Sequence, residues 1–376
     1  MKIAVNTRLL IKGKLDGIGW FSYETLKRIT RQRPNDEFIF IFDREWDDSF
    51  IFNENVTPVK VGPPSRHPFL WYLWFEQSIP KVLKKHQPDV FLSPDGYLSL
   101  NTLVPSLPVI HDLNFEHYPK DLPFWYRQYY RNYFPKYAQK ATRISTVSEF
   151  SKQDIVTKYG IDASKIDVVY NGISEYFQPL TEAEKEKSQT TFANSKPYFI
   201  FVGTLHPRKN IARLLIAFEA FKNSGNYQQN LVIVGKRKWW TSEMENTFQS
   251  ISDKGSIIFH EQLTQEQVAK AIGGSEALLY PSNFEGFGMP ILEGMQAGVP
   301  VITSNVSSMP EIASDAALLC NPFDSKSIAE QMKRLIHEPN LSESLISKGA
   351  LRAKDFSWDK SAGLLWENIE KVAYNG

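Results

Sequence analysis

The chain has 376 residues, more than one hydrophobic core usually organises and enough for two domains. Its 43 Lys and Arg residues nearly balance its 42 Asp and Glu residues, which argues against nucleic acid as a partner. The single cysteine, Cys320, excludes an internal disulfide, favours a reducing compartment and is expected to be a small buried side chain. Because no stretch approaches the ~18 uncharged apolar residues of a membrane span and no signal peptide is recognised, we expect a cytoplasmic protein.

Short apolar runs rich in β-branched and aromatic residues alternate with amphipathic stretches, which is typical of βα units and parallel sheets. The runs are KIAVN, EFIFIFD, DVFLSP, PVIHDL and RISTVS, then YFIFVGTL, NLVIVG, SIIFHE, ALLYPS and PVITS. Between the two series, the polar segment 179–196 is interpreted as a linker with room for a short helix. The sequence therefore predicts two doubly wound α/β domains, 1–178 and 197–356.

A glycine loop follows the first predicted strand. In DGIGWF, Gly17 and Gly19 precede a helical segment and would let a helix N-terminus approach a phosphate or a sugar. The loop lacks the third glycine of a dinucleotide-binding motif, and a plain turn explains it equally well.

His111 and Asp112 end the apolar strand in VIHDLNFEHYP. Side chains at this position project from the edge of a parallel sheet where ligands bind. A histidine there can donate a hydrogen bond to a sugar hydroxyl or a phosphate, and an adjacent acid can tune it. We therefore predict a functional role for His111, whereas His117 in the next loop is expected to be structural.

The segment 122–143 combines five basic residues with a dense aromatic set. On a helical wheel, one face carries Trp125, Tyr126, Tyr129, Tyr130 and Tyr133, and the other carries Arg127, Gln128, Arg131 and Asn132. Two interpretations stay open: the aromatic face packs on the domain core, which we favour, or it makes a peripheral contact with an anionic membrane surface. The aromatic cluster FLWYLWFEQ at 69–77 allows the same two interpretations.

A second loop, in VGTLHPRKNIARLLIAF, follows a buried strand that ends at Gly203 and Thr204. It carries Arg208 and Lys209 ahead of an amphipathic helix. Two cations at such a junction can neutralise a diphosphate, Arg by bidentate hydrogen bonds and Lys as a point charge. No carboxylate lies nearby in the sequence to pair with them, so a merely solvated loop is the less favoured interpretation.

Glu285 and Glu293 flank a Gly-aromatic-Gly turn in NFEGFGMPILEGMQAGVP. Proline is favoured at the first position of a helix and glycine just past its last, so a short helix is predicted from Pro290 to about Ala297, ended by Gly298. Glu285 then precedes this helix, and Glu293 lies one turn inside it.

The start of this helix is suited to an anion. The backbone N–H groups of Phe287, Gly288 and Met289, together with the helix dipole, attract a phosphate. The carboxylates of Glu285 and Glu293 instead accept hydrogen bonds from pairs of hydroxyls. A ligand with phosphates in the middle and hydroxyl-rich groups at both ends, such as a nucleotide-sugar, fits this pattern.

With these motifs in this order, the chain resembles the retaining glycosyltransferases of family 4, which have the GT-B fold of two Rossmann-like domains. The resemblance extends to TVSEFSKQDI (146–155), VVYNGIS (168–174) and MPEIASDAALLCNP (309–322). It implies that the N-terminal domain holds the acceptor, that the C-terminal domain holds a nucleotide-sugar donor, and that a last helix, 357–376, crosses back to the first domain.

The resemblance also implies residue roles. Glu285 would contact the hydroxyls of the transferred sugar, Glu293 the ribose, and Lys209 with Arg208 the diphosphate. The implied catalytic set is His111, Glu285, Lys209 and Arg208, the donor-binding set is Gly17, Gly19, Gly203, Thr204, Phe287, Gly288, Met289 and Glu293, and the acceptor-side set is Asp112 and Asn114. Many members have an arginine directly after the glycine of the second loop, where this chain has Thr204; Arg208 is the expected substitute.

The implied reaction transfers a hexose with retention and uses no metal or other cofactor; the sequence has no metal-site spacing and no Walker-type loop. The motifs are most similar to those of bacterial O-antigen and exopolysaccharide mannosyltransferases, so GDP-mannose is the leading donor and a glycan or polyprenyl-linked glycan the leading acceptor. Other GDP-, UDP- or dTDP-sugars stay open, as do a GT-B epimerase or phosphorylase and a catalytically silent binding module. A dehydrogenase is disfavoured because no GxGxxG motif with a downstream acid follows a strand.

Overall fold

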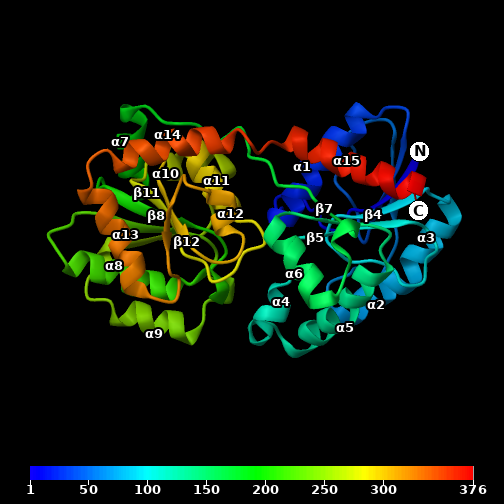
Figure 1. Ribbon diagram of the computed structural model, residues 1–376, viewed down its shortest axis with the longest axis horizontal. Coiled ribbons are helices and arrows are strands. Elements are labelled where there is room, and N and C mark those ends of the chain that lie inside the picture. Colours follow the sequence, from blue (N-terminus) through cyan, green and yellow to red (C-terminus); the bar gives the residue numbers. More distant parts are fainter. Residues whose placement is uncertain (376) are drawn as a thin grey trace. The chain divides into compact units, whose positions relative to one another are not determined.

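The computed structural model describes residues 1–375 and divides the chain into two compact units. Unit 1 contains 1–172 and the C-terminal segment that begins at Ser357, and unit 2 contains 173–356. Each unit is a parallel sheet flanked by helices (Figure 1). This architecture is the GT-B fold class predicted from the sequence.

Unit 1 is built on a seven-stranded sheet in the order β3-β2-β1-β4-β5-β6-β7, and all pairings are parallel. Its strands are β1 (Lys2–Asn6), β2 (Glu37–Phe42), β3 (Val56–Lys60), β4 (Val90–Ser93), β5 (Ser106–Ile110), β6 (Ile144–Thr146) and β7 (Ile166–Val168). Its helices are α1 (Gly17–Gln32), η1 (Asp48–Phe50), α2 (Pro68–Leu73), η2 (Trp74–Ser78), α3 (Ile79–His86), α4 (Asn114–His117), η3 (Pro119–Asp121), α5 (Phe124–Lys140), α6 (Glu149–Tyr159), η4 (Ala163–Lys165) and α15 (Trp358–Asn375).

Unit 2 is built on a six-stranded parallel sheet in the order β10-β9-β8-β11-β12-β13. Its strands are β8 (Tyr198–Val202), β9 (Asn230–Val234), β10 (Ile257–His260), β11 (Ala277–Tyr280), β12 (Val301–Ser304) and β13 (Leu318–Cys320). Its helices are α7 (Glu182–Phe192), η5 (Pro207–Lys209), α8 (Ile211–Asn223), η6 (Arg237–Trp239), α9 (Ser242–Ser250), η7 (Lys254–Ser256), α10 (Gln265–Gly273), α11 (Met289–Gln296), α12 (Met309–Ala313), α13 (Ser325–His337) and α14 (Leu341–Ala353).

All ten apolar runs in the sequence form strands, but three further strands were not predicted. These are β3, β7 and β13, and each lies at an edge of its sheet. The strands β7 and β13 have only three residues each, so neither forms a long apolar run. The edge strand β3, VTPVK, contains Pro58 and two exposed residues.

The predicted linker 179–196 belongs to unit 2 and contains the helix α7. Thr181 and Glu184 form a capping box at its start, and Phe192 is buried at its end. The Ser188 hydroxyl donates to the carbonyl of Lys270, 3.0 Å away on α10. The few apolar residues of this helix explain why its packing could not be predicted, and the units meet in sequence at 172/173 instead of 178/179.

The last helix, α15, packs within unit 1 against α1. The Asn368 side chain donates to the Ser145 hydroxyl over 3.1 Å, and the Ser361 hydroxyl donates to the Tyr170 carbonyl over 2.5 Å. Gly172 allows the close approach at the start of this helix, because a Cβ there would lie 2.2 Å from the backbone nitrogen of Trp358.

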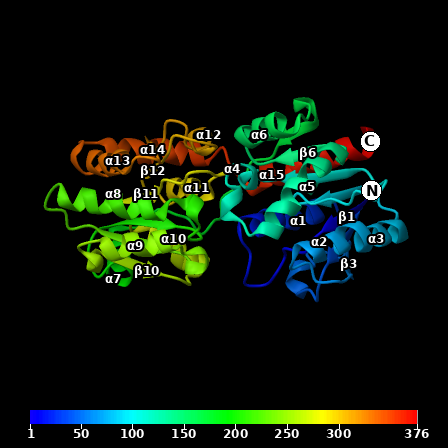
Figure 2. The same ribbon diagram turned by 90° about the horizontal axis from the view of Figure 1, so that it is seen from below.

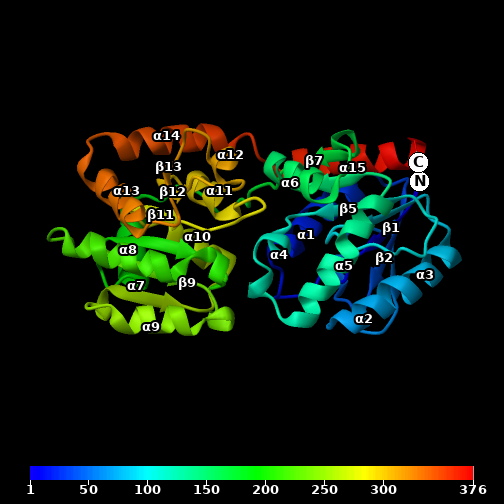
Figure 3. The same ribbon diagram turned by 60° about the horizontal axis from the view of Figure 1, so that its bottom comes forward.

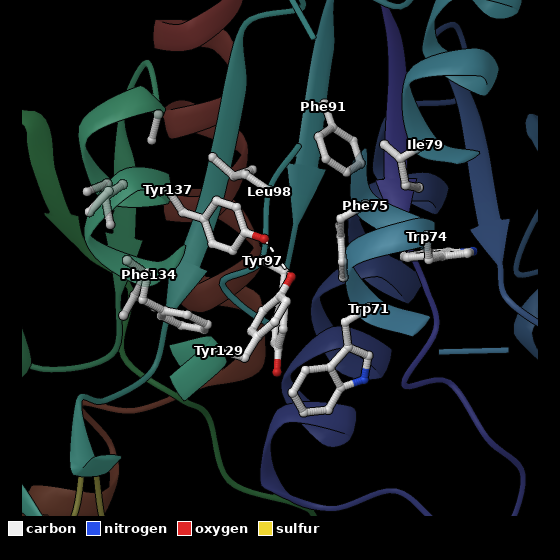
Figure 4. Close-up of a cluster of buried hydrophobic side chains, with 14 of the residues drawn as sticks. Trp71, Trp74, Phe75, Ile79, Phe91, Tyr97, Leu98, Tyr129, Phe134 and Tyr137 are labelled. Atoms are coloured by element: carbon white, nitrogen blue, oxygen red, sulfur yellow. Dashed lines mark hydrogen bonds between the residues drawn. The ribbon is translucent and has the colours of Figure 1, made fainter. Parts of the chain in front are cut away.

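The aromatic residues of α5 form part of the core of unit 1. Tyr129 and Tyr137 join Trp71, Phe75 and Tyr97 in one buried cluster (Figure 4). The Tyr129 and Tyr137 hydroxyl oxygens lie 2.7 Å apart, so the polar tips of these rings are satisfied inside the cluster. Core packing is therefore the correct interpretation for this face of the helix, except at Trp125, which is 66% exposed.

Two further predictions from the sequence concern the single cysteine and membrane-spanning helices. Cys320 is buried and free, as expected, and burial raises the pKa of its thiol to about 12. Among residues 1–375, no helix is both long and apolar enough to cross a bilayer.

Candidate active site

In unit 2, the strand order reverses between β8 and β11, which places the ends of these two neighbouring strands at the point where open α/β sheets bind ligands. The chain leaves β8 through Gly203, whose φ of +150° favours glycine. Gly235, after β9, allows a close approach there, because a Cβ on it would lie 2.0 Å from the Gly203 carbonyl oxygen. The loop after β8 thereby brings Arg208 and Lys209 to the strand ends.

Arg208, Lys209 and Glu285 form one ionic cluster. Arg208 Nη1 lies 2.7 Å from Glu285 Oε2, and Lys209 Nζ lies 2.6 Å from Glu285 Oε1. Lys209 Nζ also donates to the Tyr280 hydroxyl, so this buried ammonium contacts two side chains that follow or end β11. No carboxylate lies near these cations in the sequence, but the fold brings Glu285, 76 residues from Lys209, into contact with both.

This cluster fixes the charge of Glu285. Burial by itself raises the pKa of its carboxyl, but the charges of Arg208 and Lys209 outweigh burial and hold the pKa at about 2. Glu285 is therefore a carboxylate at neutral pH. Together the three residues present anionic and cationic groups to whatever ligand reaches the strand ends.

Three residues that sequence reasoning missed make hydrogen bonds that hold the loops around the cluster in place. The Asn210 side chain donates to the carbonyls of Pro281 and Pro322, over 2.9 and 2.6 Å. The Ser308 hydroxyl lies 2.9 Å from the carbonyl oxygens of both Glu285 and Phe287. His206 Nδ1 accepts a hydrogen bond from the Arg208 N–H over 3.3 Å.

The state of His206 also bears on the cluster. Burial, with the charges of Arg208 and Lys209, lowers the pKa of its imidazole to about 4. The neutral ring therefore serves as a hydrogen-bond acceptor at the start of η5 and adds no third positive charge. Its only sequence signal was its place directly before the cation-bearing loop.

The helix predicted after the glycine turn is α11, which runs from Met289 to Gln296 and is followed by Gly298 in a left-handed conformation. This confirms that Glu285 precedes the helix and that Glu293 lies inside it. Gly288 has a φ of +101°, which favours glycine, and it directly precedes the first helical residue. Desolvation raises the pKa of Glu293 to about 7, although the charge of Lys209 opposes this shift.

In unit 1, His111 directly follows β5, as predicted. Its Nε2 lies 2.8 Å from the Pro94 carbonyl oxygen, so Nε2 carries the proton and donates. Burial lowers the pKa of this imidazole, so the neutral ring presents Nδ1 as an acceptor. The expectation that His111 donates to a ligand therefore changes: in this arrangement its side chain accepts.

The other residues singled out in this loop of unit 1 are Asp112, Asn114 and His117. Asp112 Oδ1 accepts hydrogen bonds from the backbone and side-chain nitrogens of Asn114, over 3.0 and 2.6 Å. His117 pairs with Asp154 over 2.9 Å, in line with its expected structural role. The Asp112 charge opposes the lowering of the His111 pKa.

The glycine loop of unit 1 differs from its prediction. Gly17 and Gly19 lie in the first turn of α1, and the Asp16 carboxylate accepts a hydrogen bond from the Gly19 N–H over 3.0 Å. An Asp at this position is a strong helix cap, so the N–H expected to face a ligand is used within the chain.

Sequence reasoning missed a buried ion pair at the ends of β1 and β4. Arg8 Nε lies 2.5 Å from Asp95 Oδ2, and both side chains are nearly inaccessible to solvent. Asp95 also accepts from the Asn6 side chain over 2.8 Å, and the Arg8 guanidinium lies 4.2 Å from the centre of the Tyr97 ring. The strand order of this sheet reverses between β1 and β4, so the pair occupies its ligand-binding edge.

Two family models match consecutive parts of the chain. The model described as glycosyltransferase family 4 matches residues 16–175, and the one described as glycosyl transferases group 1 matches residues 182–352. The chain belongs to the family 4 glycosyltransferases. The cluster of Arg208, Lys209 and Glu285 lies in the group 1 match, and His111 lies in the family 4 match.

This glycosyltransferase is 28% identical to O-antigen chain mannosyltransferase B of Escherichia coli, over 93% of this chain and 94% of that protein. Among solved structures, it resembles sucrose-phosphate synthase from Thermosynechococcus elongatus, with a TM-score of 0.80, 16% identity and all of both chains covered. It also resembles Anabaena Alr3699/HepE in complex with UDP and glucose, with a TM-score of 0.76, 15% identity and 98% and 99% of the two chains covered. At these identities, the structural likeness establishes the fold alone.

Proposed function

We propose that this glycosyltransferase moves mannose from GDP-mannose to a glycan or polyprenyl-linked glycan in bacterial polysaccharide biosynthesis, with retention of the anomeric configuration. The observation that carries the proposal is the cluster of Arg208, Lys209 and Glu285 at the switch point of unit 2. The likeness to an E. coli mannosyltransferase over nearly the whole chain supports mannose as the sugar.

In the proposed mechanism, Arg208 and Lys209 bind the diphosphate and stabilise the negative charge that develops on the leaving group. A cation fixed in advance stabilises a transition state more than one that must reorganise, and the contacts of Lys209 to Glu285 and Tyr280 fix its position. We propose that these side chains, with the start of α11, supply the positive charge without a metal ion. Glu285, ionised at neutral pH, accepts hydrogen bonds from hydroxyls of the transferred sugar.

The remaining predicted residues take positioning roles in this proposal. Glu293 accepts hydrogen bonds from the ribose hydroxyls, and His111 contacts the reacting sugar through its acceptor nitrogen. Asp112 and Asn114, which bind each other, face the acceptor. Proton NMR of the glycosidic linkage in the product tests retention: an inverted anomer would refute that part of the mechanism.

Glu293 gives this proposal a pH dependence. Below its pKa of about 7, the carboxyl is protonated and is a poorer acceptor for two hydroxyls. GDP affinity, measured by calorimetry, is expected to fall up to about tenfold per pH unit below that pKa and to level off above it. Because the GDP phosphate also titrates, the same series on Glu293→Gln is the control. Equal pH profiles for both proteins would remove Glu293 from nucleotide binding.

A calorimetric comparison of UDP, GDP, dTDP and ADP tests the donor site itself. GDP is expected to bind best, and Lys209→Ala is expected to weaken binding roughly 10- to 100-fold because a charged hydrogen bond contributes about 1.5–3 kcal/mol. Lys254→Ala, an exposed lysine of the same unit, is the matched control. Thermal melts of both variants confirm folding.

The outcomes of this titration separate the alternatives. Preference for UDP would replace GDP-mannose with a UDP-sugar, the nucleotide class bound in the HepE structure. Absence of binding to all four nucleotides would favour the catalytically silent binding module.

A further inference from the structure

Two helices of unit 1, α3 and α5, carry basic residues and no Asp or Glu. Helix α5 contains Arg127, Arg131, Lys136 and Lys140 and no acidic residue, and α3 contains Lys81, Lys84 and Lys85 and no acidic residue. Glu76 in η2, just before α3, is buried and accepts a hydrogen bond from the Leu100 N–H, and Glu116 on α4 lies 3.8 Å from Arg131. In a chain with a net charge of only +1, this is a strong local concentration of positive charge.

Helices α2 and α5 expose large aromatic side chains. Phe69 and Tyr72 on α2 are 64% and 40% exposed, and Phe124 and Trp125 on α5 are 54% and 66% exposed. Figures 2 and 3 show α2, α3 and α5 side by side on one side of unit 1. Ring contacts join α2 to α5, among them Trp71 with Tyr126 and Tyr72 with Tyr133, at centroid distances of 5.1 and 6.2 Å.

We propose that this aromatic-basic face, formed by the four exposed aromatic residues and the basic residues of α3 and α5, binds an anionic phospholipid bilayer. Aromatic rings are suited to the boundary between headgroups and acyl chains, and the surrounding cations are attracted to anionic headgroups. The face differs from the one seen on the helical wheel, because Tyr126, Tyr129, Tyr130 and Tyr133 pack wholly or partly against the core. Three of the exposed aromatic residues are instead at the starts of α2 and α5, and Tyr72 is near the end of α2.

The cations of the face are available for this contact. Arg131 has one acidic neighbour, Glu116, at 3.8 Å, and this exposed ion pair contributes little to stability. Arg127 lies over the Phe124 ring at 5.6 Å, which places a cation beside an exposed aromatic side chain. Each cation near an anionic membrane surface contributes about a fivefold increase in binding, and this contribution falls with added salt.

Sedimentation of the full chain with vesicles tests the proposal. The protein is expected to sediment with vesicles that mix phosphatidylcholine and phosphatidylglycerol, and much less with phosphatidylcholine alone. Arg127→Glu/Arg131→Glu is expected to weaken binding at least about tenfold. Phe69→Ser/Trp125→Ser is expected to weaken binding as well, because insertion of the rings is lost.

The matched control reverses two exposed lysines of unit 2, Lys187→Glu/Lys254→Glu, and is expected to bind as the original chain does. If Arg127→Glu/Arg131→Glu fails to fold, as judged by circular dichroism, Lys136→Glu/Lys140→Glu replaces it. Equal binding by the original chain and the face variants would overturn the proposal. So would equal binding to both kinds of vesicle, or tighter binding to a single-stranded RNA than to the anionic vesicles. No nucleotide enters this assay, so its result is independent of the proposed donor.

Discussion

Glu285→Gln is expected to reduce the rate of sugar transfer at least ~100-fold, which corresponds to a loss of about 3 kcal/mol of transition-state stabilisation. The amide has nearly the same shape as the carboxylate but lacks its charge, so it accepts hydrogen bonds from sugar hydroxyls less strongly. It also cannot neutralise Arg208 and Lys209, which both contact Glu285 within 2.7 Å. The positions of two phosphate-binding cations are therefore expected to change together with the sugar contact.

Initial rates at saturating donor, with thermal melts to confirm folding, measure this effect. Glu266→Gln is the matched control, since Glu266 lies in the same unit and its ion pair with Lys270 is exposed. That variant is expected to keep normal activity. Near-normal turnover of Glu285→Gln would exclude Glu285 from the mechanism, whatever nucleotide the enzyme uses.

Asp95→Asn is expected to lower the free energy of unfolding by about 3–5 kcal/mol, because it leaves the buried Arg8 guanidinium without its counter-charge. The loss is large because water cannot readily solvate this cation, which lies among the rings of Trp71, Phe75 and Tyr97. Urea unfolding at neutral pH measures the change.

Two further variants separate charge from shape in this measurement. Asp359→Asn removes one of the two acidic partners of Arg28, but Asp359 is 76% exposed, so a change of less than about 1 kcal/mol is expected. Arg8→Met combined with Asp95→Asn is expected to recover most of the lost stability, because no unpaired charge stays buried. A double variant as unstable as Asp95→Asn alone would show that the charge is not the cause.

The sequence predicted features whose signals are local. The positions of Pro290 and Gly298 predicted both ends of α11 to within one residue, because proline and glycine act through their own backbone preferences. The central strands were predicted because strands covered on both faces need continuous apolar runs. The strands β7 and β13 are only three residues long, β3 contains a proline, and α7 carries few apolar residues, so their signals were too weak.

The charge relations in the sites could not be predicted in the same way. Lys209 and Glu285 are 76 residues apart, and Arg8 and Asp95 are 87 residues apart. Each pair forms only because two strands become neighbours at a reversal of strand order, which no local pattern encodes. His111 was located correctly by its strand, but the direction of its hydrogen bond depends on the carbonyl of Pro94, which directly follows the neighbouring strand β4.

The place of α15 has a consequence for how the protein is made. Unit 2 is continuous in sequence, whereas unit 1 is completed only by the residues that follow Phe356. During synthesis on the ribosome, the whole sequence of unit 2 is therefore available while unit 1 still lacks α15. Unit 2 can be completed before unit 1, although domains usually fold in order from the N-terminus. Until the residues of α15 are available, Phe38 lacks its ring contact with Trp366, and the face of α1 that packs against α15 stays uncovered.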